Sequence, residues 1–235
     1  MKPLIGIISR PHRDTDGGCE LGIMDAYRNA IIRNGGNTIC ILPTQYFVYE
    51  ENSPYHTPKM TEEEIEMLKM QLSFCDGIVM PGGSKWYEYD EIVCKYCLEN
   101  DIPILGICMG EQIMGNIILN DNKVNGDKTI KNDSKINHQQ PSVSYVHSVL
   151  IDTNSKLYQI IGQNEIMVNS RHNYHIEEKE SFKVVARATD GIIEAIEYPN
   201  NTFAIGLQWH PESLVEFDEN SNKIFKALIN AAKSK

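Results

Sequence analysis

One short segment around a cysteine constrains this chain more than any other feature. It reads Gly106-Ile107-Cys108-Met109-Gly110. The apolar run at residues 102–105 is typical of a short buried strand, and residues 111–119 fit a helix. Glycines two residues away on both sides permit the sharp turn of a nucleophile elbow, because side chains there would collide with neighbouring backbone. A cysteine at such a helix N-terminus is favoured as the thiolate, which is the nucleophilic form.

The five other cysteines are expected to be small core residues. They are Cys19, Cys40, Cys75, Cys94 and Cys97. The last two form a CxxC inside a predicted helix, with no second CxxC and no His pair at finger spacing, so we expect helix packing and no metal site. Six cysteines in 235 residues do not make a disulfide scaffold.

The length of the chain fits one large α/β domain or two small ones. The 235 residues are 41% hydrophobic, and no linker or internal repeat divides them, so we expect a single catalytic domain over residues 1–235. The net charge of −10 argues against nucleic acid and against anionic membranes as partners. No segment approaches the ~18 apolar residues of a membrane span, and residues 1–9 fit a first strand rather than a signal peptide. A free catalytic thiol then suits a reducing cytoplasm.

Strand and helix patterns alternate through the first half of the chain. Strands are expected at residues 4–9, 38–42 and 77–80, and helices at 24–34, 61–72 and 88–99. Thr61 and Glu64 form a capping box at the start of the second helix. Such alternation predicts a parallel sheet with helices on both faces, and ligands then bind at the carboxyl ends of the strands. Pro81-Gly82-Gly83 and Cys108 both fall at such ends.

The second half is richer in strands. They are expected at residues 142–152, 166–169, 182–188, 192–198 and 203–207, followed by a helix at 219–232. Residues 120–141 are polar and fit a long loop, and residues 44–59 fit a lid or edge.

A thiolate that attacks an amide needs a base, a group that orients the base, and an oxyanion hole. His210 is the candidate base at a strand end, and Glu212 can return to the imidazole if Pro211 forces a turn. The backbone N–H of Met109 and that of Gly82 or Gly83 are the candidate oxyanion donors.

Three segments resemble the motifs of class I glutamine amidotransferases. They are Pro81-Gly82-Gly83, Gly106-Ile107-Cys108-Met109-Gly110-Glu111-Gln112 and Gln208-Trp209-His210-Pro211-Glu212. The closer likeness is to the peptidase C26 branch, which comprises γ-glutamyl-γ-aminobutyrate hydrolases and γ-glutamyl hydrolases. Further likeness to that branch lies in Ile5-Gly6-Ile7 with Arg10-Pro11, in residues 144–149 and in Val168-Asn169-Ser170-Arg171-His172.

The resemblance implies a fold and a reaction. The fold is a flavodoxin-like α/β three-layer sandwich with a mostly parallel central sheet. The reaction is hydrolysis of a γ-glutamyl amide through a γ-glutamyl thioester, without a cofactor. Cys108 matches the nucleophile, His210 the base and Glu212 the orienting acid. By the same resemblance, Gln112 contacts the substrate, and Ser170 and His172 match a loop that lines the pocket.

The chain differs from this branch at two positions, so the identity of the amine that leaves the substrate stays open. Met109 stands where many members carry Arg, and Tyr174 stands where many carry Gln. The missing Arg suggests a substrate without a distal carboxylate. The acidic residues Asp14, Asp16 and Glu20 could meet a cationic amine, although an ordinary solvated loop is the simpler interpretation.

Three functions fit the sequence. The first is a free-standing hydrolase whose partner is a small γ-glutamyl substrate. The second is a glutaminase subunit that delivers ammonia to a synthetase on a separate chain. The third is a non-catalytic redox or stress protein whose elbow cysteine senses oxidant, although a sensor needs no His-Pro-Glu. A homodimer is expected only from the general frequency of such assemblies.

Overall fold

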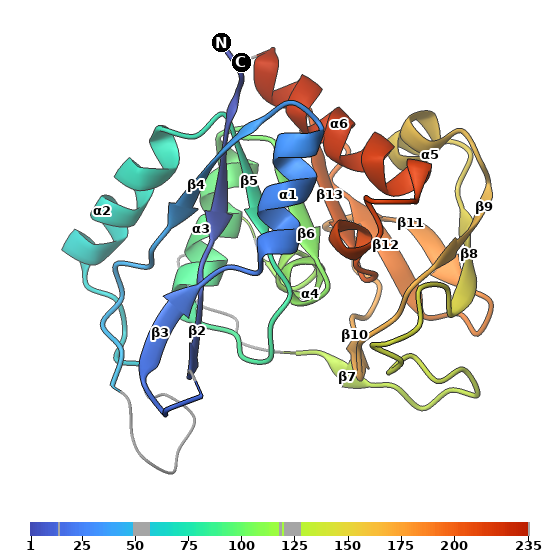
Figure 1. Ribbon diagram of the computed structural model, residues 1–235, viewed down its shortest axis with the longest axis horizontal. Coiled ribbons are helices and arrows are strands. Elements are labelled where there is room, and N and C mark those ends of the chain that lie inside the picture. The colour runs from blue at the N-terminus through green and yellow to red at the C-terminus, as the bar shows by residue number, and fades with distance from the viewer. Residues whose placement is uncertain (14, 49–56, 118, 120–127, 235) are drawn as a thin grey trace.

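The computed structural model describes residues 1–13, 15–48, 57–117, 119 and 128–234, and its core is one nine-stranded sheet (Figure 1). The parallel half is formed, in sheet order, by β4 (Asn37–Ile41), β1 (Leu4–Ile8), β5 (Gly77–Met80), β6 (Ile104–Ile107) and β13 (Ala204–Leu207). β5, β6 and β13 are buried along their whole length, as expected for parallel strands covered on both faces. Their carboxyl ends share one edge of the sheet.

The other half of the sheet is antiparallel. From β13 it continues through β12 (Ile193–Glu197), β11 (Lys183–Ala188), β8 (His147–Ile151) and β9 (Glu165–Val168). The sequence predicted each of these strands, but the one expected from residue 142 begins only at His147. The α/β fold class is confirmed, and the parallel sheet predicted from the first half extends into a mixed one.

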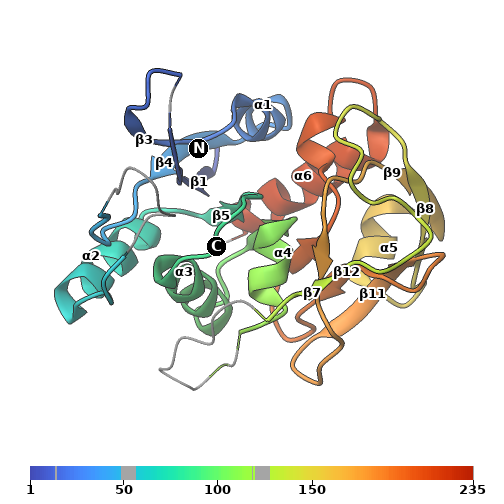
Figure 2. The ribbon, with the colours of Figure 1, turned by 90° about the horizontal axis from the view of Figure 1, so that it is seen from below.

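Helices cover both faces of the sheet (Figure 2). One apolar cluster contains buried side chains of α1 (Asp25–Arg33), α5 (Lys156–Ile161) and α6 (Glu219–Lys233). A second contains those of α2 (Glu62–Ser73), α3 (Glu88–Glu99) and α4 (Met109–Met114). Two separate clusters divided by one sheet make the three-layer sandwich. The predicted capping box is present at Thr61 and Glu64. Cys75, Cys94 and Cys97 are buried as expected, but Cys19 and Cys40 are exposed, so their prediction as core residues was wrong. Cys40 lies on the edge strand β4, and Cys19 lies in a polar surface segment.

Several elements differ from the sequence prediction. A ribbon of β2 (Arg10–Arg13) and β3 (Cys19–Gly22) was not expected, because its polar residues lack a strand's apolar alternation. α5 was also missed, as was the short pair β7 (Ile130–Lys131) and β10 (Tyr174–His175). The helix after the cysteine is α4, which begins two residues earlier and ends sooner than predicted. Residues 14, 49–56 and 120–127 of the predicted loops lie outside the described part of the chain.

Within the described residues, no helix has both the length and the apolar character that a membrane span requires.

The turn between β6 and α4 is a strained elbow. Cys108 has φ 54°, a left-handed conformation that non-glycine residues rarely adopt. A Cβ on Gly106 would lie 2.7 Å from the Gly110 carbonyl carbon, and a Cβ on Gly110 would collide with the Met80 carbonyl oxygen. The Cys108 N–H donates to the Leu207 carbonyl at 2.7 Å, which ties the elbow to β13. Close backbone packing therefore explains both glycines.

Replacing Gly110 by alanine is expected to lower the free energy of unfolding by about 3 kcal/mol, because the new Cβ overlaps the Met80 carbonyl. Urea-induced unfolding measures this loss. Gly162→Ala is the matched control: Gly162 ends α5 at φ 78° with open space around it, so only the left-handed backbone costs stability, about 1 kcal/mol. Equal losses in the two variants would contradict the close-packing explanation.

Candidate active site

Three predicted residues meet at the carboxyl edge of the sheet. Cys108 follows β6, and His210 follows the neighbouring strand β13. Pro211 begins a short 3₁₀ turn, Pro211–Ser213, that brings Glu212 back to the ring, with its Oε1 2.7 Å from His210 Nδ1. All three residues are buried, with exposed fractions of 7% for Cys108, 9% for His210 and 2% for Glu212. The predicted return of Glu212 to the imidazole is thus seen in the geometry.

The His210 imidazole is held as a cation. Burial lowers its pKa, but the charges of Glu212 and Cys108 and hydrogen bonds to both raise it, with a net increase from 6.5 to about 10. At neutral pH the ring is therefore protonated and can face a thiolate. Because the folded chain binds this proton more tightly than the unfolded chain, the resulting stabilisation is complete below about pH 6.5. It is lost as the pH rises through about 10.

A buried amide fixes the backbone of His210. Asn169 Oδ1 accepts from the His210 N–H at 2.8 Å, and Asn169 Nδ2 donates to the His210 carbonyl at 2.9 Å. Asn169 is 1% exposed and follows β9, at the far end of the antiparallel half of the sheet from β13. From the sequence, Asn169 stood out only as part of a family-like segment, with no predicted role. The two hydrogen bonds identify it as a positioning residue for the imidazole.

The glycine turn after β5 approaches the cysteine closely. A Cβ on Gly82 would lie 3.0 Å from His210 Cε1 and 3.4 Å from both Cys108 Cβ and the Tyr27 hydroxyl. The Gly82 N–H donates to that hydroxyl at 3.0 Å. Burial raises the pKa of Tyr27, and the nearby Glu212 charge raises it further. A substrate oxygen that uses the Gly82 N–H must therefore share or displace Tyr27, a residue that sequence analysis missed.

The other candidate donors lie beside this turn. Met109 is the first residue of α4, and its side chain lies against Gly83: a Cβ there would be 2.7 Å from Met109 Cε. The roles of Gly82, Gly83 and Met109 in an oxyanion hole stay predictions.

The candidate substrate contacts are occupied by internal partners. Gln112 Nε2 donates to the Tyr174 carbonyl at 2.8 Å and to Gln208 Oε1 at 2.9 Å. Ser170 and His172 are buried in a separate polar cluster, where Ser170 Oγ lies 3.2 Å from His138 Nδ1. Their contact with substrate stays a prediction, and in this conformation they hold the protein's own segments together.

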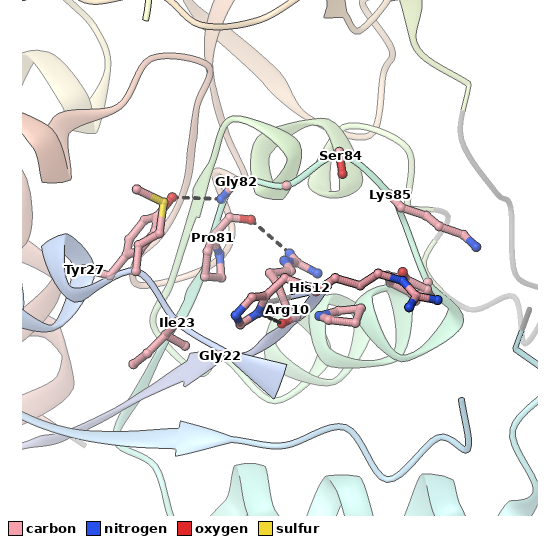
Figure 3. A pocket seen from close by; sticks show the side chains of 14 residues that line it. Arg10, His12, Gly22, Ile23, Tyr27, Pro81, Gly82, Ser84 and Lys85 are labelled. Carbon is pink, nitrogen blue, oxygen red and sulfur yellow. Dashed lines mark hydrogen bonds between the residues drawn. The ribbon is translucent and has the colours of Figure 1, made fainter. Parts of the chain in front are cut away.

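A cavity of about 860 Å³ opens next to the elbow (Figure 3). Tyr27, Gly82 and Gly83 line it on the side of Cys108, which the Gly82 backbone approaches, and the β2–β3 ribbon supplies a wall. Arg10 is fixed in that wall by an ion pair with Asp90 and by donation to the Pro81 carbonyl at 2.9 Å. Arg13 and Lys85 also line the cavity, so its charged lining is cationic. The predicted acidic contact is less favourable, because Glu20 pairs with His12 at 3.0 Å, Asp16 is exposed and Asp14 is outside the described residues.

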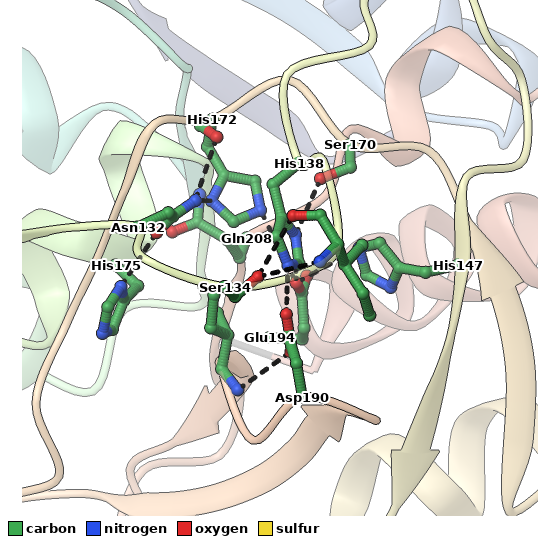
Figure 4. Close-up of polar contacts among 12 residues, drawn as sticks. Asn132, Ser134, His138, His147, Ser170, His172, His175, Asp190, Glu194 and Gln208 are labelled. Carbon is green, nitrogen blue, oxygen red and sulfur yellow. Dashed lines mark hydrogen bonds and ion pairs between the residues drawn. The ribbon is translucent and has the colours of Figure 1, made fainter.

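A second buried cluster lies one strand beyond β13. His138, His147, His172 and Glu194 bring their polar atoms within 4.8 Å of one another (Figure 4). Burial raises the pKa of Glu194 to about 7 although His147 and His138 oppose this, and burial lowers the pKa of His172 to about 4. This cluster was not predicted from the sequence, where no metal site was expected, because its residues follow no local ligand spacing. The only signal was that two of the quoted family-like segments contain His147 and His172.

Comparison with known proteins gives a consistent result. The family model described as peptidase C26 matches residues 85–212, more than half of the chain. The chain is 29% identical to a glutamine amidotransferase-like protein of Rickettsia prowazekii over 88% of each protein. It is 30% identical to the anthranilate synthase component 2 of Cyanophora paradoxa, over 73% of this chain and 82% of that protein.

Two further similarities are partial or distant. The chain is 32% identical to the CTP synthase of Borreliella afzelii over 66% of this chain, but it spans only 34% of that protein. Among solved structures, a GMP synthase subunit from Thermoplasma acidophilum superposes with a TM-score of 0.64 at 17% identity, covering 99% of this chain and 95% of that one. An identity that low shows the fold alone.

Glu212→Gln is expected to lower the pKa of His210 well below its native value of about 10, because the neutral amide no longer stabilises the imidazolium. Histidine side-chain NMR across a pH titration measures the change, with His210→Asn to assign the signal. Ser213→Ala is the control, because Ser213 Oγ carries no charge and makes only a long contact, at 3.5 Å, with the same carboxylate oxygen. An unchanged His210 pKa in Glu212→Gln would rule out the carboxylate as the stabilising charge.

Proposed function

Because the chain belongs to the peptidase C26 family of class I glutamine amidotransferase-like proteins, which are hydrolases of C–N bonds, we propose that it hydrolyses a γ-glutamyl amide to glutamate and an amine. The main support for this proposal is that Cys108, His210 and Glu212 lie together at one edge of the sheet. We assign the three residues as a catalytic triad: nucleophile, general acid-base and orienting carboxylate.

The first proposed step forms a thioester. The Cys108 thiolate attacks the γ-carbonyl carbon and forms a C–S bond, and the C–N bond then breaks. The leaving nitrogen takes its proton from the His210 imidazolium, which the Glu212 carboxylate stabilises. The products of this step are the γ-glutamyl thioester and the free amine or ammonia.

The second proposed step regenerates the enzyme. Neutral His210 takes a proton from water, and the resulting hydroxide equivalent attacks the thioester carbonyl. The C–S bond breaks, glutamate leaves, and Cys108 returns as the thiolate beside a protonated His210. In both steps we assign stabilisation of the tetrahedral oxyanion to the N–H groups of Met109 and of Gly83 or Gly82.

The cationic cavity supports a substrate whose amine part carries negative charge. Lys85 and Arg13 line the space beside the elbow, so the cavity is cationic although no arginine stands at position 109. Burial lowers the pKa of Lys85, and its ammonium lies 5.3 Å from the Tyr87 ring centre. We therefore favour a γ-glutamyl amine with a distal carboxylate, the reverse of what the sequence departure at Met109 suggested.

A second candidate is a glutaminase subunit that serves a separate synthetase. Its support is the likeness to an anthranilate synthase component 2 and to about one third of a CTP synthase. On this alternative, glutamine is the substrate and its turnover depends on a partner chain.

The predicted domain organisation, compartment, substrate contacts and oligomeric state are also proposals. A single catalytic domain over residues 1–235 fits the one continuous nine-stranded sheet. A reducing cytoplasm fits six cysteines that are all free thiols. Ser170, His172 and Gln112 stay candidate substrate contacts, which they would make only after giving up internal contacts, and a homodimer stays a prediction.

Glutamate release from glutamine, γ-glutamyl-γ-aminobutyrate, γ-glutamyl-putrescine and a γ-glutamyl peptide tests the proposal. We expect the carboxylated γ-glutamyl-γ-aminobutyrate to be turned over best, and Cys108→Ala to reduce the rate at least about 1000-fold. A quenched reaction should contain a glutamyl adduct on Cys108 by mass spectrometry. Asn100→Ala, an exposed change at the end of α3, serves as the control for handling.

The alternatives give different results in the same assay. Turnover of glutamine alone, at a low rate, would favour the glutaminase subunit over the hydrolase. No glutamate from any of the four compounds, with the thiol intact, would contradict the free-standing hydrolase, whereas a glutaminase subunit would turn over glutamine only once its partner chain is added.

Lys85→Met is expected to raise the KM for γ-glutamyl-γ-aminobutyrate about tenfold, a change of about 1.4 kcal/mol, because it removes a cation from the cavity wall. The KM for γ-glutamyl-putrescine, whose amine part is cationic, should fall or stay unchanged. Steady-state kinetics measure both values. Lys69→Met on the exposed side of α2 is the charge-matched control. Equal effects on the two substrates would contradict an electrostatic role for Lys85.

A further inference from the structure

The buried cluster contains four side chains from four separate segments. His138 lies in the loop before β8, His147 begins β8, His172 lies between β9 and β10, and Glu194 lies on β12. All four residues are buried, and one potential ligand atom of each lies within 4.8 Å of the others. Figure 4 shows the three imidazoles gathered around the Glu194 carboxylate. The fold has thus assembled a site that no local motif encodes.

Backbone carbonyls indicate which ring nitrogen carries the hydrogen in His147 and in His172. His147 Nδ1 lies 3.2 Å from the Ser148 carbonyl, and His172 Nδ1 lies 3.1 Å from the Tyr174 carbonyl. A carbonyl oxygen only accepts, so each Nδ1 carries the hydrogen and each Nε2 of the neutral ring presents a lone pair. Asn132 Nδ2 donates to the His172 carbonyl at 3.1 Å and lies 3.3 Å from His172 Nδ1, so the assignment of His172 rests on the shorter contact of Nδ1, to the Tyr174 carbonyl.

A carboxylate indicates which ring nitrogen of His138 carries the hydrogen. His138 Nε2 lies 2.9 Å from Asp190 Oδ2, so it donates there and Nδ1 faces the cluster with its lone pair. A ring nitrogen that donates to a carboxylate while the other nitrogen faces inward is the usual outer contact of a metal-binding histidine. Ser170 Oγ, 3.2 Å from His138 Nδ1, is the one hydroxyl that approaches this nitrogen among the described residues.

Apart from the Ser170 hydroxyl, which can donate to His138 Nδ1, the groups of His138, His147, His172 and Glu194 that face the interior of the cluster are acceptors. Glu194 Oε1 lies 3.5 Å from His138 Nδ1, 3.4 Å from His147 Nε2 and 3.5 Å from His172 Nε2. Both Glu194 oxygens and the Nε2 atoms of His147 and His172 have no hydrogen-bond partner in the described part of the chain. Buried acceptors without donors are costly, and a cation between them removes that cost.

The spacing also suits a metal ion. A tetrahedral site with bonds of about 2.0–2.1 Å separates its ligand atoms by about 3.3 Å. The three distances of 3.4–3.5 Å from Glu194 Oε1 are close to this value. Imidazole nitrogens with one carboxylate oxygen suit Zn²⁺ and neighbouring divalent ions, whereas Ca²⁺ and Mg²⁺ require mainly oxygen ligands.

We propose that His138, His147, His172 and Glu194 form a binding site for one divalent transition-metal ion of the zinc type, with Asp190 as the carboxylate that orients His138. Four protein ligands in a buried setting make a closed, structural site rather than a catalytic one.

The position of the site gives the ion a structural consequence. His172 belongs to the same loop as Asn169, which holds the His210 backbone from both sides. Gln208, two residues before His210, donates its backbone N–H to the Glu194 carbonyl at 2.8 Å. A metal ion at the cluster therefore secures the two segments that position His210, while remaining outside the proposed chemistry.

Metal binding to the full-length chain tests the proposal. The chain is stripped with a chelator and titrated with Zn²⁺ by calorimetry, and with Co²⁺ by its visible absorption. A Cys108→Ala background is used in parallel, because a Cys–His pair can also bind zinc. We expect one ion per chain in both backgrounds and a higher thermal midpoint with Zn²⁺ than without it.

Variants separate this site from adventitious binding. Glu194→Gln retains the shape of the side chain and offers an amide donor to the imidazoles, so it should fold while its Zn²⁺ affinity falls at least about 100-fold. Asp190→Asn, which changes only the outer contact, should lose about 10- to 100-fold. His175→Gln is the matched control and should retain one ion per chain, because His175 Nδ1 bonds to Asn132 at 2.8 Å outside the cluster.

Three results would overturn the proposal. They are no stoichiometric binding to the parent chain, binding that survives in Glu194→Gln, and binding that disappears in Cys108→Ala alone. None of these readouts depends on turnover, so failure of the metal site leaves the proposed hydrolase unaffected.

Discussion

The close approach of Gly110 to the Met80 carbonyl is the contact on which the rest of the site depends. It brings α4 against the end of β5, so the chain must leave β6 through a left-handed residue, and that residue is Cys108. The Gly82 backbone lies close to Cys108 Cβ and to the His210 imidazole at the same edge of the sheet. Strain at one residue thereby defines where the proposed nucleophile, base and oxyanion donors can meet, and the surrounding parallel strands resist its release.

Buried ionisable side chains form two neighbouring groups that differ in how their charge is balanced. Around His210, an anionic carboxylate and a thiol surround a cation, and the pKa of the imidazole rises to about 10. Around Glu194, three lone pairs and a carboxylate face one another, and burial raises the pKa of that carboxyl to about 7. Asn169 and Gln208 connect the two groups through the backbone. The first group is balanced by residues within the chain, whereas the second is short of positive charge, which is why we propose that it binds a metal ion.

The sequence predicted the residues that carry strong local signals. The glycine pair identified the elbow, and Pro211 correctly predicted the return of Glu212 to His210, because each of these depends on a few consecutive residues. Tyr27, Asn169 and His138 could not be found in this way. Tyr27 fits an ordinary apolar position of α1. Its hydroxyl becomes part of the site only because the fold places the Gly82 N–H, which follows β5, within hydrogen-bond distance of it. The polar β2–β3 ribbon was missed for the same reason, since only tertiary contacts make it a wall of the cavity.

Sequence alone determined the fold class, the order of most strands and helices, and the three residues of the candidate triad. These follow from periodicity, turn residues and short motifs, all of which act over a few neighbouring positions. Tertiary structure decided the direction of the second half of the sheet, the cationic cavity and the cluster around Glu194. Those features arise where segments distant in sequence are packed together, and the burial and charge that give them their chemistry exist only after that packing.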